Sequence, residues 1–176
     1  MKVLTDAILF AAKSHSGQFR KDGRTPYINH PLEVMHLLNH AAGVSDESVL
    51  VAAVLHDVVE DTDVTVAEIA ERFGERVAAL VSEMTDDKTL RKEERKRLQL
   101  LTAHELTPDA RLIRISDKIC NVYDILYAPP DDWGINRRID YLEWAEAVVN
   151  KIRHSNAALE NRFDELIREG RKFLGD

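Results

Sequence analysis

The spacing of apolar residues along the chain predicts a protein built from α-helices. Apolar side chains recur at intervals of three and four residues in the segments 4–12, 77–84 and 159–167. This spacing places them along one face of a helix, which can then pack against a core. Helices are therefore expected over the ranges 2–15, 31–42, 46–59, 65–73, 75–84, 91–106, 108–127, 134–153 and 156–173.

Residues that commonly begin helices stand at several of these boundaries. Pro31 and Pro108 occupy positions where the first turn of a helix accepts proline, and Thr65 begins a capping-box pattern. Asp46 precedes the run 49–59, which opens with an unbroken apolar stretch. Because apolar residues lie on all sides of this stretch, we expect a buried helix at the centre of the fold.

The composition is that of one globular domain. The 176 residues are 44% apolar and 31% charged, and no linker-like or repetitive stretch divides them. We therefore expect a single domain over residues 1–176, with one continuous core. No apolar run approaches the roughly 20 residues that span a bilayer, and the first residues do not resemble a signal peptide. These features predict a cytoplasmic protein without a membrane partner.

Charge and cysteine content narrow the choice of partners. The formal net charge of −7 argues against a nucleic-acid polymer as the partner. Cys120 is the single cysteine, so it cannot form an internal disulfide or a thiolate metal cluster. We expect Cys120 to be a small buried residue in a protein of a reducing compartment. Any metal ligands would then be His, Asp and Glu.

Four ionisable residues end the apolar run and form the first candidate site: His56, Asp57, Glu60 and Asp61. In one continuous helix, residues four apart lie one above the other, which would stack His56 on Glu60. Unpaired carboxylates are costly to bury, so such groups are usually paired, hydrogen-bonded or bound to a cation. A metal ion near His56 and Asp57 would remove that cost.

Two distant segments supply further candidate ligands. His30 stands at the start of a predicted helix, and Asp117 interrupts another apolar helix, with Asn121 one turn later. The combined set of His30, His56, Asp57 and Asp117 offers nitrogen and oxygen ligands without sulfur. Such a set suits Mn²⁺, Fe²⁺ or Zn²⁺ better than Ca²⁺. We expect one ion per chain, with manganese as the first choice.

The order of these residues resembles a known family pattern. His30, then His56-Asp57, then Asp117 is similar to the H…HD…D pattern of the HD metal-dependent phosphohydrolases. Several stretches also resemble the hydrolase domain of RelA/SpoT proteins, most of all the stand-alone small alarmone hydrolases with their metazoan SpoT-like relatives. They are Arg20–Pro31, Leu55–Thr62, Thr85–Leu90 and Glu94–Gln99, within a likeness that runs from about Ala7 to Leu159.

The resemblance implies an all-α helical bundle of the HD type that binds Mn²⁺. It also implies that the enzyme removes the 3′-pyrophosphate of the guanine nucleotides ppGpp or pppGpp and leaves GDP or GTP. The implied metal ligands are His30, His56, Asp57 and Asp117, with Glu60 and Asp61 as the catalytic acidic pair. Because no synthetase region follows in the sequence, the chain is expected to hydrolyse the alarmone without making it.

The same resemblance implies a set of substrate contacts. Arg20 and Lys21 would flank the guanine, with the guanidinium stacked on the base. Asn121 and Tyr141 would lie against the ribose and base, and Lys92 would bind phosphates. The residue type at each position fits such a contact, since cations bind phosphates and planar groups stack on a base.

Other charged and aromatic residues are expected to be structural. Arg91, Arg95 and Lys96 should form a solvated helix face, as charge runs on helices usually do. Tyr141 and Trp144 are three residues apart, so at least one of them should belong to the core. No function is expected for the remaining histidines, which are His15, His36, His40, His104 and His154.

Three other interpretations stay open. A related nucleotide phosphohydrolase, such as one that removes the 2′-phosphate of NADPH, would use the same metal site and the same cations. A catalytically silent alarmone sensor would bind the nucleotide without turnover, although intact Glu60 and Asp61 argue against it. An RNA-binding domain would use the basic stretch 88–97.

Overall fold

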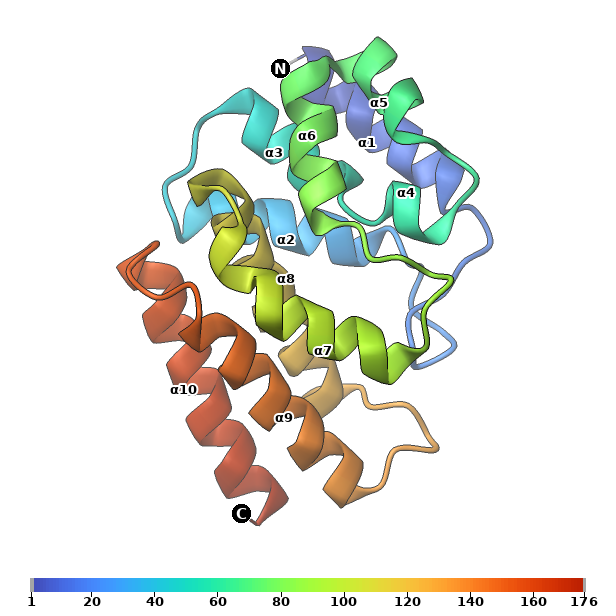
Figure 1. Cartoon of the computed structure of the whole chain (residues 1–176). Coiled ribbons are helices and arrows are strands. Elements are labelled where there is room, and N and C mark those ends of the chain that lie inside the picture. The colour runs from blue at the N-terminus through green and yellow to red at the C-terminus, as the bar shows by residue number, and fades with distance from the viewer. Residues whose placement is uncertain (1, 176) are drawn as a thin grey trace.

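The chain folds into a bundle of α-helices, as the sequence pattern predicts. The computed structural model describes residues 2–175, and Figure 1 shows their path. The helices are α1 (Lys2–Ser14), α2 (Asn29–His40), α3 (Glu47–Leu55), α4 (Val58–Asp61), α5 (Val66–Phe73), α6 (Glu75–Met84), α7 (Lys92–Thr102), the 3₁₀ turn η1 (Ala103–Glu105), α8 (Pro108–Tyr127), α9 (Ile135–Asn150) and α10 (Ala157–Leu174). Residues 2–175 contain no β-strand, only an isolated antiparallel bridge between Phe19 and Pro26.

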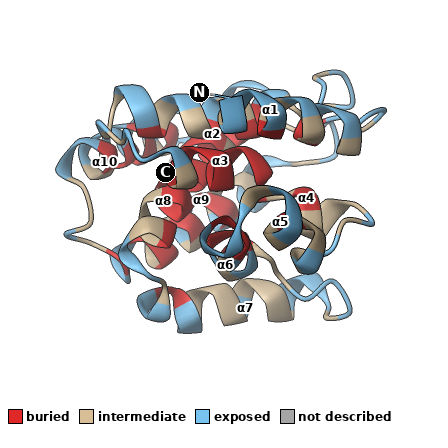
Figure 2. Cartoon of the chain, turned by 90° about the horizontal axis from the view of Figure 1, so that it is seen from above, coloured by how far each residue is buried: buried red, intermediate tan, exposed pale blue. Residues whose placement is uncertain are grey.

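Helix α3 lies at the centre of the bundle. Every residue from Val49 to Leu55 is buried, and α1, α2, α6 and α8 all pack against this helix. Figure 2 shows buried residues along α3 and on the parts of the neighbouring helices that face it. The stretch that is apolar on all sides is therefore the central helix that the sequence predicts. Its burial removes a large apolar surface from water, which is the main force that holds the surrounding helices together.

Side chains at the predicted boundaries cap the helices. The Asp46 carboxylate accepts a hydrogen bond from the Ser48 amide at 2.9 Å. The Thr65 hydroxyl accepts one from the Glu68 amide at 3.2 Å, and Thr107 caps α8 in the same way. Such caps satisfy amide groups that have no partner inside the helix. The starts of α3, α5 and α8 are thus confirmed to within one residue.

The predicted helix 46–59 is wrong in one respect, because it is interrupted. Helix α3 ends at Leu55, His56 and Asp57 form a turn, and α4 occupies only Val58–Asp61. Neither glycine nor proline marks this turn, so the local sequence gives no signal for it. Neighbouring side chains on a regular helix point about 100° apart. The turn instead allows both His56 and Asp57 to face the same site.

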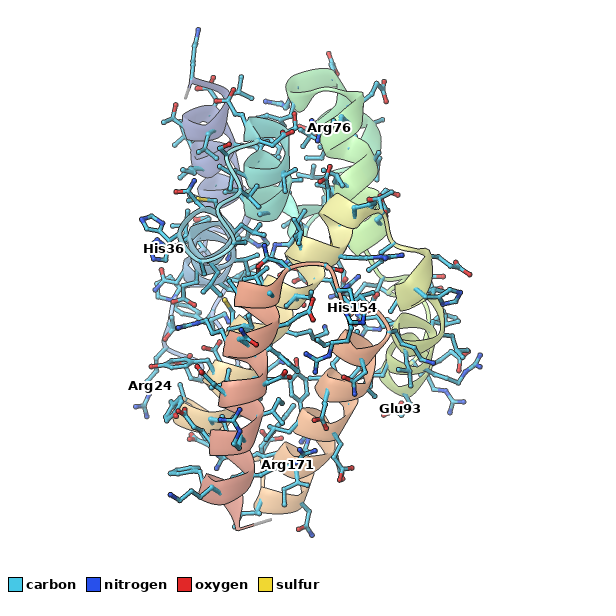
Figure 3. The ribbon with its side chains drawn as sticks, turned by 90° about the vertical axis from the view of Figure 1, so that its left-hand side faces the viewer. Arg24, His36, Arg76, Glu93, His154 and Arg171 are labelled. Atoms are coloured by element: carbon cyan, nitrogen blue, oxygen red, sulfur yellow. The ribbon has the colours of Figure 1, made fainter. Side chains whose placement is uncertain are left out.

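Helix α2 begins and ends two residues before the predicted range 31–42, and two other helix ends differ from the prediction by three residues or more. Helix α7 ends at Thr102 and continues as η1, where one helix was expected over 91–106. Helix α9 ends at Asn150, before a turn in which His154 has a φ of 66°. Figure 3 shows the turn that leads from α9 into α10 and in which His154 lies. Among the helices that the structure describes, none is both long and apolar enough to cross a membrane.

Helices α8, α9 and α10 pack closely against one another at one end of the bundle (Figure 1). A β-carbon at Gly170 of α10 would lie 2.6 Å from Leu142 of α9 and 3.1 Å from Leu126 of α8. Glycine therefore permits the close approach of α10 to both helices. This packing fixes the position of α9, which carries Tyr141. Cys120 on α8 is buried, as predicted.

Candidate functional site

Three segments that are far apart in the sequence bring candidate metal ligands together. His30 lies in the first turn of α2, His56 follows the end of α3, and Asp117 lies in the middle of α8. Helices α2, α3 and α8 pack against one another, which sets the separation of these side chains. One ligand atom from each of His30, His56 and Asp117 lies within 4.8 Å of the other two. The structure therefore contains the convergence that the sequence predicts.

Asp57 completes this cluster. Its Oδ2 atom lies 3.3 Å from His56 Nε2 and 3.6 Å from His30 Nε2. Asp117 Oδ1 lies 3.1 Å from His30 Nε2 and 3.8 Å from His56 Nε2. His30, His56 and Asp117 are buried, whereas Asp57 retains some contact with solvent. Two imidazole nitrogens and two carboxylate oxygens therefore face one small volume.

His56 presents the nitrogen that a metal ion needs. Its Nδ1 atom lies 2.8 Å from the carbonyl oxygen of Ala53, which can only accept, so Nδ1 donates its hydrogen there. Among the described residues, the buried Nε2 atom of His56 has no hydrogen-bond partner. A backbone acceptor on one ring nitrogen commonly orients the other nitrogen towards a metal. This orphaned nitrogen beside two carboxylates fits a divalent cation with nitrogen and oxygen ligands.

The carboxylates alter the acid–base behaviour of the two histidines. Burial disfavours the charged form of His56, but Asp57 and Asp117 outweigh burial and raise the pKa of His56 to about 10. For His30, burial prevails and lowers the pKa. Burial opposes ionisation of Asp57 and Asp117, yet nearby positive groups hold both pKa values below their ordinary range. A cation bound by this cluster would displace the proton from His56.

Polar groups outside the cluster hold its carboxylates in place. Asn121 Nδ2 donates to Asp117 Oδ1 at 2.5 Å from one helical turn away, as the spacing predicts. The buried Lys118 Nζ lies 3.1 Å from Asp117 Oδ2. The Tyr27 hydroxyl lies 2.8 Å from Asp57 Oδ2. Such contacts fix the orientation of ligand carboxylates.

The candidate acidic pair lies on α4, beside the ligand cluster. The Asp86 amide donates to Glu60 Oε2 at 3.0 Å, and Arg95 Nη1 lies 3.2 Å from Glu60 Oε1. Lys88 forms an ion pair with Asp61 and lies 3.7 Å from Glu60 Oε1. Burial raises the pKa of Glu60, which brings its titration closer to neutral pH. Glu60 is therefore suited to gain and release a proton.

The expectation of a solvated face on α7 is wrong for two residues. Arg95 is only partly exposed and pairs with Glu60. Lys96 Nζ lies 4.6 Å from the centre of the Trp144 ring. Arg95 therefore faces α4, and Lys96 faces α9, against which α7 packs. Arg91 is exposed, as predicted.

Every site residue predicted from the sequence lines one cleft, which has a volume of about 360 Å³. The predicted metal ligands and acidic pair in this lining are His30, His56, Asp57, Asp117, Glu60 and Asp61. The predicted substrate-binding residues in it are Arg20, Lys21, Lys92, Asn121 and Tyr141. Their placement agrees with the sequence analysis, and their individual roles stay predictions.

Tyr141 and Trp144 of the cleft lining, together with the neighbouring Trp133, form an aromatic cluster that carries an excess of cations. The ring centres of Trp133 and Tyr141 are 5.8 Å apart, and those of Tyr141 and Trp144 are 5.3 Å apart. Cationic groups lie 4.3 to 5.4 Å from these ring centres, namely Lys21, Lys92, Lys96, Lys118 and Arg137. An acidic protein thereby gains a local positive region that attracts phosphate groups.

Arg20 is largely engaged by other protein groups. Its guanidinium donates to Asp124 Oδ2 from Nε at 2.9 Å and from Nη2 at 2.7 Å. Nη2 also donates to Asn121 Oδ1 at 2.8 Å. The guanidinium carbon lies 5.4 Å from the centre of the Tyr27 ring. Stacking of Arg20 on guanine stays a prediction.

Sequence reasoning assigned no role to Tyr27 and Lys118, which line the cleft, or to Trp133, whose ring lies against Tyr141 of the cleft lining. Tyr27 lies three residues before His30, inside a stretch that carries the family resemblance, and this proximity is the one available signal. Lys118 follows Asp117 directly, but the sequence does not distinguish it from other lysines on helices. Trp133 lies in the loop before α9, so its place depends on how α9 packs. Packing of that kind leaves no local pattern in the sequence.

Comparison with known proteins gives the family. A model of the HD domain matches residues 7–139. Human guanosine-3′,5′-bis(diphosphate) 3′-pyrophosphohydrolase MESH1 is 46% identical over 94% of this chain and 93% of its own length. The Drosophila melanogaster protein of the same name is 44% identical over 93% of this chain and 92% of its own.

A solved structure agrees with these matches. It belongs to a metazoan orthologue of SpoT that is described as hydrolysing ppGpp. The two folds superimpose with a TM-score of 0.93 at 43% sequence identity, over 96% of each chain. The predicted all-α fold and the family resemblance are both confirmed. The chain belongs to the HD-domain family and, within it, to the group formed by MESH1 and its relatives.

Proposed function

We propose that this chain hydrolyses the 3′-pyrophosphate of ppGpp or pppGpp and releases pyrophosphate with GDP or GTP. The observation that carries the proposal is the convergence of ligand atoms from His30, His56 and Asp117 in a cleft with a cationic wall. The activity named for human MESH1 supports this choice of substrate. A substrate with two diphosphate groups needs both a hydrolytic centre and separate positive charge to bind the group that is retained.

The proposal includes Mn²⁺ as the resident ion. His30 and His56 would hold it through Nε2, and Asp57 and Asp117 through carboxylate oxygens. When bound, such an ion draws charge from phosphoryl oxygens and lowers the pKa of water. A mixed nitrogen and oxygen set with two carboxylates favours manganese over ions that prefer sulfur.

Glu60 and Asp61 are proposed to orient the attacking water and to accept its proton. Both side chains line the cleft next to the ligand cluster. The Tyr27 hydroxyl lies within hydrogen-bond distance of both Asp61 and Asp57, so the acidic pair is tied to that cluster. The raised pKa of Glu60 suits it to hold the proton, with Arg95 fixing its carboxylate.

Lys21, Lys92 and Lys96 are proposed to bind the phosphate groups that are not cleaved. All three line the cleft and lie against its aromatic rings. No carboxylate among residues 2–175 forms an ion pair with any of them. Their positive charge is therefore available to an anionic ligand.

Product analysis tests the proposed function. Purified protein, stripped with EDTA and reloaded with Mn²⁺, is incubated separately with ppGpp and with NADPH. We expect pyrophosphate and GDP from ppGpp only after Mn²⁺ is restored. Phosphate from NADPH without pyrophosphate from ppGpp would instead assign the chain as a 2′-phosphatase. Tight binding of ppGpp without products would assign it as a sensor.

Lys21 gives substrate binding a specific pH dependence. The residue as a whole is exposed, but protein atoms displace water from its ammonium group. This desolvation, together with repulsion by Arg20 and Lys92, lowers the pKa of Lys21 to about 8. The group is charged below this pH and neutral above it, so its attraction for phosphate falls as pH rises. Its protonated fraction falls about tenfold between pH 7 and pH 9. We therefore expect KM for ppGpp to rise several-fold over this interval.

The control for this pH effect is Lys21→Arg, whose guanidinium stays charged throughout. Steady-state KM values measured for both proteins at intervals from pH 7 to pH 9 give the comparison. The variant should show a flatter KM profile. The same rise in KM for both proteins would assign the effect to another group.

A further inference from the structure

Helix α4 carries the acidic pair but is too short to hold its own position. It spans only Val58–Asp61, which is 4 residues and about one helical turn. Isolated helices shorter than roughly 12 residues are marginal in water, so other elements must hold this one. Asp86 and Arg95 hold Glu60. Separate contacts reach Asp61 from the segment between α1 and α2.

Gln18 joins that segment to the end of α4. Its Nε2 group donates to the backbone carbonyl of Asp61 at 2.8 Å. Its Oε1 atom lies 2.8 Å from His15 Nδ1 and can only accept, so His15 is the donor. His15 is buried, with 3% of its surface exposed. The two hydrogen bonds form a chain that is partly shielded from water, where such bonds are strengthened.

Tyr27 reaches the side chain of the same residue. Its hydroxyl lies 2.7 Å from Asp61 Oδ2 and 2.8 Å from Asp57 Oδ2. The hydroxyl carries one hydrogen, so it acts as a shared donor between the two carboxylates. The Tyr27 ring stacks on His15 with ring centres 4.7 Å apart. His15, Gln18 and Tyr27 therefore form one connected unit that contacts both the backbone and the side chain of Asp61.

We propose that His15, Gln18 and Tyr27 form a clamp that positions Asp61 for the reaction, an inference that rests on the proposed function. His15 and Gln18 are absent from the lining of the cleft, so they act through Asp61 and not on the substrate. They are positioning residues. Misplacement of a reacting group by about 1 Å lowers the rate about 100-fold, which sets the scale of the expected effect.

Two variants interrupt the clamp at different points. Gln18→Met keeps the length of the side chain and removes both hydrogen bonds. Tyr27→Phe keeps the ring on His15 and removes only the hydroxyl. Ser16→Ala is the matched control, because Ser16 is exposed and lies in the same segment. Thermal melting checks that all proteins are folded.

Kinetics with ppGpp and Mn²⁺ distinguish positioning from general destabilisation. We expect kcat to fall about 10- to 100-fold in Gln18→Met and in Tyr27→Phe, with little change in KM. Combined with Asp61→Asn, Gln18→Met should lower kcat by less than about threefold further, because effects that act through one residue do not add. Unchanged kcat in the single variants, or full additivity with Asp61→Asn, would overturn the clamp.

Amide hydrogen exchange on the nucleotide-free protein tests the clamp independently of turnover. The amides of residues 60–62 should exchange about tenfold faster in Gln18→Met than in the wild type and in Ser16→Ala. Equal exchange would overturn the clamp even if the enzyme is active. A third outcome is also informative: exchange is faster in Gln18→Met, but the wild-type protein releases no pyrophosphate from ppGpp. This outcome would sustain the positioning of Asp61 and reject the proposed function.

Discussion

Asp117→Ala should abolish Mn²⁺ binding and lower the rate of ppGpp hydrolysis at least about 1,000-fold. The carboxylate lies 3.1 Å from His30 Nε2 and accepts a hydrogen bond from Asn121, so its loss removes a ligand and disorders another. A catalytic cation supplies several kcal/mol of charge stabilisation, and each loss of about 1.4 kcal/mol is roughly tenfold in rate. The buried Lys118 also loses its partner, which costs about 3–5 kcal/mol of folding stability.

Loss of folding must be separated from loss of the ligand. Asp117→Asn keeps the size of the side chain and can still hydrogen-bond, so it should remain folded and bind Mn²⁺ poorly. Asp109→Ala is the matched control on the same helix, since Asp109 is partly exposed, is absent from the lining of the cleft, and its partner Arg76 also pairs with Asp46. Calorimetric titration with Mn²⁺, thermal melting and single-turnover rates give the comparison. A folded Asp117→Asn protein with wild-type Mn²⁺ affinity would remove Asp117 from the ligand set.

Glu60→Gln should retain Mn²⁺ and lower kcat about 100-fold or more. The amide can still accept from the Asp86 amide and keeps the shape of the side chain, but it cannot take up a proton at neutral pH. Positioned acid–base groups contribute about 100- to 10,000-fold to a rate. Because burial raises the pKa of Glu60, ionisation of this side chain opposes folding above that pKa, so a neutral amide should not lower the melting temperature at pH 7.

Glu94→Gln is the matched control for this substitution. Glu94 lies on α7, pairs with Arg97 at 2.6 Å and is absent from the lining of the cleft. Its variant should keep the wild-type kcat. Metal content and kcat measured side by side decide the role of Glu60. Full activity in Glu60→Gln would transfer the proton-handling role to Asp61.

The sequence predicts the helices well where local chemistry determines them. The caps at Asp46, Thr65 and Thr107 correctly mark the starts of α3, α5 and α8. The turn at His56 and Asp57 could not be predicted, because both residues are compatible with a helix and no glycine or proline marks the break. Propensity is a weak guide wherever tertiary contacts favour another conformation.

The candidate site likewise contains residues that could be predicted from the sequence and residues that could not. The ligand cluster could be predicted, because buried ionisable residues are unusual and their order matches a known family pattern. Arg95 and Lys96 could not be placed, since Arg95 depends on its pairing with Glu60 of α4 and Lys96 on the rings of α9. His15 and Gln18 carry no chemical signal of their own, because they contact each other, the Tyr27 ring and the backbone of a distant residue. Such roles emerge only from three-dimensional contacts.

The opposite walls of the cleft come from different parts of the fold. The candidate ligand histidines and carboxylates belong to segments packed around α3, whereas Lys92, Lys96 and Tyr141 belong to α7 and α9. Tightly packed interiors resist substitution, while peripheral helices and loops tolerate it. Substitutions in the outer elements could therefore change, during evolution, which phosphorylated metabolite the cleft accepts, while the candidate metal ligands are retained.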